Sequence, residues 1–271
     1  DEAMTKTQLV YAKFDGAAWS VPVDIGNYAG GKYPLLYSIA ASGTDVSIAW
    51  AQNSLNDYTF ATGTTTIYKQ QMTGGAWGVV TQVAAPSNVG SLAVGTIGGV
   101  FKTVYSTDLD NNTATAGDSE LYIDGTRYTT NTVDDAGASF QNGSFYWVSG
   151  GMLTKYGESA LALAVNNDYR VISNGVKTAV VWPASNGFKN ELAVSTLSSG
   201  VYSNPVDLTA YGRHISDYDA VMDSAGTVIA AMDIDNLSGD PDLYPYTTTD
   251  FLVDNIGQTV NLGIGGNIDF D

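Results

Sequence analysis

The chain has 271 residues, of which 44% are hydrophobic, 11% aromatic and only 14% charged, and this composition excludes an intrinsically disordered protein. The formal net charge of −17 repels phosphate backbones and argues against nucleic acid as a partner. No stretch approaches the roughly 18 apolar residues of a membrane span, and the lack of cysteine excludes disulfides and thiolate metal sites.

The first predicted element is a hairpin at residues 7–25. Its turn contains Asp15-Gly16, which supplies the positive φ angle that a tight turn requires, and Trp19 begins the returning strand. Related hairpin sequences recur, with varying fidelity, at residues 74–78, 124–129 and 202–208. The chain is therefore predicted to contain a repeated structural unit.

A second type of hairpin alternates with the first along the chain. Its turns lie at Ser42-Gly43, Gly98-Gly99, Asn142-Gly143, Asn174-Gly175 and Ala225-Gly226, and an apolar strand follows each one. The order of hairpin, loop, hairpin, loop gives four strands in about 40 to 50 residues, which is typical of a propeller blade. Helices are not expected, because no window sustains a period of 3.6 residues.

With the strands of a blade named A to D from the axis outward, whole blades are predicted at residues 33–84, 89–133, 136–166, 167–210 and 215–255. The hairpin at 7–25 and the stretch 259–270 would together supply one more. We therefore predict an all-β, six-bladed β-propeller of four-stranded blades, a single domain over residues 1–271, whose last blade is closed by N-terminal and C-terminal hairpins. Such a closure hides exposed strand edges. The alternative is a truncated part of a larger propeller.

Four aromatic residues end the predicted B strands at equivalent places: Trp50, Tyr105, Trp147 and Trp182. Their recurrence favours a structural role, with large rings wedged between neighbouring blades, over stacking on a ligand.

The hairpin sequence from Tyr11 to Val23 resembles those of secreted bacterial β-propellers related to the Asp-box (BNR-like, sialidase-type) repeat proteins. The Asp-box pattern itself, Ser-x-Asp-x-Gly-x-Thr-Trp, is not matched, because the spacing from Asp15 to Trp19 is one residue shorter and the threonine is missing. The resemblance implies the fold and an extracellular or cell-surface location in a bacterium. It brings no catalytic residues to this chain.

In a propeller the B–C and D–A loops share one face, and the long B–C loops are predicted at residues 51–65, 107–119, 183–190 and 233–241. Functional residues gather on elaborate loops held by a rigid scaffold, so a ligand is expected there. The aromatic residues Tyr58, Phe60 and Phe188 would stack on a sugar or pin their own loops. Arg213 and His214, in a D–A loop, would bind a carboxylate or act as a base, or remain solvated.

Two of the B–C loops are acidic and alike. The first contains Asp108, Asp110, Asn112 and Asp118, and the second contains Asp233, Asp235 and Asp240. Aspartate and asparagine oxygens are the ligands that Ca²⁺ prefers, so these loops are candidate calcium sites, although neither has the EF-hand spacing. The alternative is that the side chains cap turns through their own backbone.

The sequence favours a non-catalytic binding or scaffold module, a monomeric domain of a larger secreted or surface protein, that recognises a glycan or a protein through its loop face. No converging acid and base pair is evident. The alternative is a glycoside hydrolase or lyase with an aspartate-based site on the same face, because two carboxylates suffice for glycoside hydrolysis.

Overall fold

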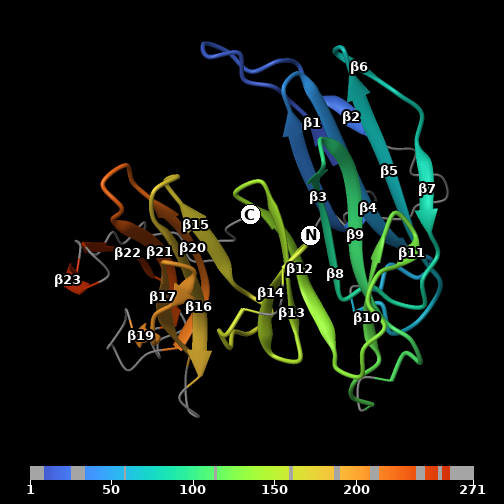
Figure 1. Cartoon of the computed structure of the whole chain (residues 1–271). Coiled ribbons are helices and arrows are strands. Elements are labelled where there is room, and N and C mark those ends of the chain that lie inside the picture. Colours follow the sequence, from blue (N-terminus) through green and yellow to red (C-terminus); the bar gives the residue numbers. More distant parts are fainter. Residues whose placement is uncertain are drawn as a thin grey trace. The chain divides into compact units, whose positions relative to one another are not determined.

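The computed structural model describes residues 9–25, 34–57, 59–112, 115–158, 161–185, 190–207, 214–235, 242–249 and 252–256. Within these ranges all regular structure is β-strand, arranged in antiparallel sheets (Figure 1). The same residues contain no helix long and apolar enough to cross a membrane. The all-β prediction is confirmed for this part of the chain. The chain divides into two compact units, Asp1–Gly150 and Gly151–Asp271.

The first unit begins with a small sheet of β1 (Leu9–Tyr11) and β2 (Val23–Ile25). The next sheet runs β3 (Pro34–Ser42), β4 (Asp45–Asn53), β5 (Thr65–Thr73) and β6 (Ala76–Trp77), and β7 (Thr81–Ala84) also pairs with β5. A third sheet runs β8 (Ser91–Ile97), β9 (Val100–Asp108), β10 (Ser119–Ile123) and β11 (Thr126–Arg127). Then β12 (Asp135–Gln141) pairs with β13 (Ser144–Ser149).

The second unit begins with β14 (Met152–Lys155). One sheet runs β15 (Arg170–Ser173), β16 (Thr178–Ser185), β17 (Asn190–Ser198) and β18 (Val201–Tyr202), with β19 (Val206–Asp207) also on β17. The last runs β20 (His214–Met222), β21 (Val228–Asp235), β22 (Asp242–Thr249) and β23 (Leu252–Ile256).

The sheets follow the predicted repeat closely. Each predicted turn of the second hairpin type joins two antiparallel strands, and four predicted units coincide with sheets in which neighbours in sequence are neighbours in space. The third predicted unit, 136–166, spans the border between the two compact units. The number of blades, their closure and the single domain over residues 1–271 stay predictions.

The repeated hairpin is held by a repeated hydrogen-bond pattern. The Ser20 amide donates to the Lys13 carbonyl at 2.7 Å, and the Ser20 hydroxyl accepts from the Lys13 amide at 2.9 Å. In the second unit Ser203 makes the same two bonds with Thr196, at 2.8 and 3.1 Å. In each case the serine hydroxyl accepts a hydrogen bond from a backbone amide that a regular strand pair would bond to a carbonyl. The returning strand can therefore leave the sheet without leaving that amide unpaired.

Consecutive sheets of the first unit are packed together by apolar clusters. Trp50 packs with Ile25 between the first hairpin and the β3–β7 sheet. Tyr105 lies in the next cluster, between the β3–β7 and β8–β11 sheets. Trp147 lies in the one after, between the β8–β11 sheet and the β12–β13 hairpin. Trp50, Tyr105, Trp147 and Trp182 are 1%, 2%, 6% and 5% exposed. These placements confirm that the recurring aromatic residues belong to the core.

Candidate functional site

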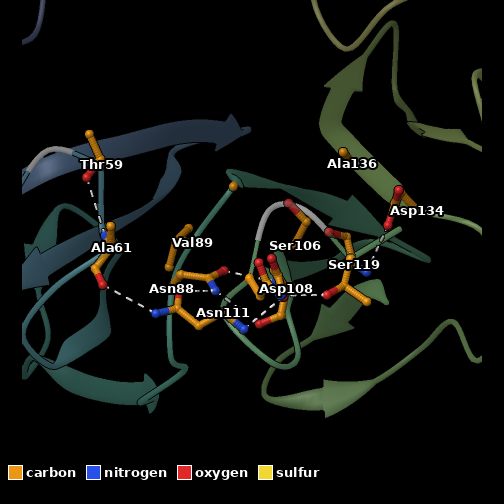
Figure 2. A pocket seen from close by; sticks show the side chains of 13 residues that line it. Thr59, Ala61, Asn88, Val89, Ser106, Asp108, Asn111, Ser119, Asp134 and Ala136 are labelled. Carbon is orange, nitrogen blue, oxygen red and sulfur yellow. Dashed lines mark hydrogen bonds between the residues drawn. The ribbon is translucent and has the colours of Figure 1, made fainter. Parts of the chain in front are cut away.

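A pocket of about 430 Å³ opens in the first unit where loops of consecutive sheets meet (Figure 2). Its walls come from the loop between β4 and β5, the connection from β7 to β8, the loop between β9 and β10, and the start of β12. In the predicted scheme these are two B–C loops and two D–A connections. The structure therefore brings together, within this unit, loops that were predicted to share a face.

The side chains that line the pocket are polar and small. They offer hydroxyls from Thr59, Ser106 and Ser119 and carboxylates from Asp108 and Asp134, and asparagine amides lie beside them. Neither lysine, arginine nor histidine is among the described residues of the lining. A pocket of this kind disfavours anions and suits a neutral or cationic ligand with several hydrogen-bonding groups.

The amide of Asn88 organises the pocket wall (Figure 2). Its oxygen accepts from the Asp108 amide at 2.9 Å, and its nitrogen donates to the Asp108 carbonyl at 3.0 Å and to Asn111 Oδ1 at 2.8 Å. Asn111 in turn donates to the Ala61 carbonyl at 3.3 Å, which joins the loops of two sheets. One side chain thus fixes the start of the acidic loop against its neighbours.

Asp134 fixes the other end of the same loop. Its Oδ1 accepts from the backbone amides of Gly117, Asp118 and Ser119 at 2.8, 3.2 and 3.2 Å. Gly117 has a φ of +84°, and a Cβ there would lie 2.5 Å from the Thr132 carbonyl oxygen, so only glycine fits without a backbone shift. The acidic loop is therefore held at both ends.

Three carboxylates of this loop converge. One oxygen from each of Asp108, Asp110 and Asp118 lies within 4.8 Å of the others. Asp108 Oδ1 also accepts backbone amides from Asp110 and Asn111, at 3.2 and 2.9 Å, and Asp110 Oδ1 accepts from the Asn112 amide at 2.8 Å. Turn capping by Asp108 and Asp110 is thus present. Calcium binding by the loop stays a prediction.

Asp118 differs from the other two carboxylates. Its Oδ1 is buried and has no hydrogen-bond partner. Burial, followed by the nearby charges of Asp108 and Asp110, raises the pKa of Asp118 above its ordinary value. None of the ion pairs in the described residues involves these three side chains. Either a proton or a cation would relieve their mutual repulsion.

The remaining predicted site residues fall in two groups. Phe60 is buried in the apolar cluster with Ala51 and Val89, and its φ of +55° is uncommon for a bulky residue. Its ring anchors its own loop, and stacking on a ligand stays a prediction. The others lie outside the described residues (Tyr58, Phe188, Arg213 and Asp240) or have only their backbone described (His214, Asp233 and Asp235).

Sequence reasoning missed Asn88 and Asp134, although a signal for the first exists. Asparagine recurs shortly before an A strand at Asn88, Asn131 and Asn166. Asn166 donates to the carbonyl of Pro183 at 2.6 Å, as Asn88 does to that of Asp108. A search for residues that repeat in the D–A connections would have found this position.

No family model and no curated protein sequence matches the chain. Among solved structures it is similar to Zg3597, a family 117 glycoside hydrolase produced by the marine bacterium Zobellia galactanivorans, with a TM-score of 0.46 and 11% identity over 88% of this chain and 73% of that one. It is also similar to a Mycobacterium tuberculosis puromycin-hydrolysing peptidase, with a TM-score of 0.45 and 14% identity over 78% of this chain and 36% of that one. A third similar structure is an engineered GH43 glycoside hydrolase with endo-xylanase and exo-arabinofuranosidase activity. Its TM-score is 0.38, with 10% identity over 81% of this chain and 53% of that one. Likenesses of this size assign neither an activity nor a ligand.

Proposed function

We propose that the chain is a six-bladed β-propeller that binds a neutral glycan in the pocket beside Asn88, without catalysing a reaction. The fold proposal is supported by the sheets of the first unit, which are antiparallel, ordered as meanders and packed on one another in chain order. We further propose that it acts outside a bacterial cell as a monomeric domain of a larger secreted or surface protein.

The lining of the pocket is the observation that carries the binding proposal. Hydroxyl, amide and carboxylate groups face a concave space of about 430 Å³ that has no cationic side chain among its described residues. Pockets of roughly 300 to 1,000 Å³ hold small molecules, whereas protein partners are usually bound over broader surfaces. Sugars are small, neutral and rich in hydroxyls, so they fit this chemistry better than a protein or an anion.

Calcium is part of the proposal. Asp108, Asp110 and Asp118 present three oxygens to one point, and Ca²⁺ is held by six to eight oxygens in flexible geometry. Backbone carbonyls and water would supply the remaining oxygen ligands. A cation here would hold the acidic loop in place at the rim of the glycan pocket.

A glycan array screened with and without calcium tests the proposal. Wild-type protein is expected to bind neutral glycans, more tightly with calcium. Ala61→Trp, at an exposed lining position, should abolish binding, whereas Ala17→Trp, on the exposed turn of the first hairpin, should not. Binding that is equal in both variants, or none at all, would contradict the proposal.

The alternative of a glycoside hydrolase or lyase is favoured by one observation. Burial and the neighbouring carboxylates of Asp108 and Asp110 raise the pKa of Asp118, and a raised pKa is a property of a general acid. Turnover of array-positive polysaccharides by the wild type, lost in Asp118→Asn, would establish catalysis in place of simple binding. Glycan binding without turnover would instead support the non-catalytic binding module.

A further inference from the structure

Glu120 is a buried carboxylate whose hydrogen bonding is incomplete. It lies in β10, is 1% exposed, and Arg127 Nη2 donates to its Oε1 at 2.5 Å, but its Oε2 has no partner. The other deeply buried carboxylate among the described residues of this unit is Asp135, whose two oxygens accept from Trp147 at 3.1 Å and Asn131 at 2.7 Å. Buried polar groups are nearly always paired, so the missing partner of Oε2 points to a group that is not part of the chain.

The strand register places Glu120 beside a second cleft. Glu120 lies opposite Thr107 on β9 and two residues before Tyr122 on β10, so the three side chains share one face of the sheet. Thr107 and Tyr122 both line a cleft of about 240 Å³. Glu120 itself does not line the cleft, but its side chain lies on the face of the sheet that bounds it.

The cleft is amphipathic. Its apolar walls are the connection at 84–86 and Leu109, which is 42% exposed. The rings of Tyr105 and Tyr122 stack, with centroids 5.2 Å apart and planes at 11°, and burial together with Tyr122 raises the pKa of Tyr105 to about 12, which keeps its hydroxyl a donor. Because Arg127 neutralises Glu120, the cleft favours a neutral ligand over an ion.

We propose that this cleft binds one neutral, hydroxyl-bearing ring the size of a single sugar residue. The C–H face of the ring packs on Leu109 and Tyr122, and one hydroxyl donates to Glu120 Oε2. Oε2 is hidden from solvent, so binding includes a small side-chain shift in the cleft wall, a common event on complex formation.

The cleft and the loop pocket lie on either side of one strand end. Ser106 and Asp108 line the pocket, whereas Thr107 and Leu109 line the cleft, because successive side chains of a strand point to opposite faces. The cleft is thus a second subsite next to the first. The inference rests on the proposed glycan function for its class of ligand.

Methyl-labelled NMR with a panel of neutral methyl glycosides tests the inference. The methyl signals of Leu109, Ala84 and Ala85 should shift on titration. Ala85→Trp, an exposed lining position, should abolish these shifts, and Ala61→Trp, which blocks the loop pocket, should leave them intact. Glu120→Gln, which replaces the accepting oxygen pair by an amide, should weaken binding about tenfold.

The outcomes separate the two proposals. Shifts confined to Ala136 and the other methyl groups of the loop pocket would overturn the second subsite and leave the proposed function standing. A titration in which no signal moves would overturn both. An ordered water bonded to Glu120 Oε2 that persists in crystals saturated with a glycoside would also overturn the second subsite.

Discussion

At the scale of single residues, Asp57 shows how a partly exposed carboxylate organises a loop. Its Oδ1 accepts from the Thr59 amide and hydroxyl at 3.0 and 2.7 Å, and its Oδ2 accepts from the Thr62 amide and hydroxyl at 2.8 and 2.7 Å. These hydrogen bonds hold the pKa of Asp57 well below its ordinary value. The Thr62 hydroxyl contributes most, followed by the Thr59 hydroxyl and the two backbone amides. Both carboxylate oxygens of Asp57 therefore serve to hold the loop.

This geometry predicts a pH-dependent contribution to stability. The folded pKa is lowered, so the contribution is complete above the unfolded pKa of about 4 and is lost as the pH falls through the folded value. Asp57→Asn should therefore lower Tm at pH 7, and the difference from wild type should shrink below about pH 4. Thermal melts between pH 7 and pH 2 measure it. A difference that stays constant to pH 2 would refute the assigned role.

At the scale of elements, the repeated hairpin offers a matched pair of hydroxyls. The Thr129 hydroxyl, which is buried, accepts from the Leu121 amide at 2.9 Å, as the exposed Ser20 hydroxyl does from Lys13. Thr129→Val should destabilise the protein by about 1–3 kcal/mol, because it orphans a buried amide, whereas Ser20→Ala should cost less, since water can replace that hydroxyl. Urea denaturation compares the two. Equal costs would show that burial is not the deciding factor.

The elements were more predictable from the sequence than the site. Turns such as Asn142-Gly143 impose a hairpin locally, so strand order followed from residues adjacent in the chain. The convergence of Asp134 on the loop at 117–119 depends on a contact between two connections, which no local pattern encodes. The sequence alone does not single out Glu120, because the missing partner of its Oε2 is visible only once burial is known.

At the scale of the whole molecule, the proposed closure predicts that an exposed apolar surface on β3 is covered by another strand. Tyr37 and Ile39 on β3 are 46% and 51% exposed. They lie opposite Trp50 and Ile48, so they share the face on which the first hairpin packs. That hairpin supplies only β1 and β2 and leaves these two side chains uncovered. Under the closure proposal, inner strands from residues 259–270, which lie outside the described residues, would cover them.

Ile39→Asp distinguishes closure from truncation. An exposed substitution usually changes stability by less than about 0.5 kcal/mol, whereas placing a carboxylate under a covering strand costs several times more. Closure predicts a large loss of stability for Ile39→Asp and a small one for Val100→Asp, at a strand position that is 59% exposed. Deleting residues 259–271 should itself destabilise the protein and should remove most of the extra cost of Ile39→Asp, which a thermodynamic cycle measures. Equal, small costs for both substitutions in the full chain would instead show that β1 and β2 belong to a blade whose inner strands lie elsewhere.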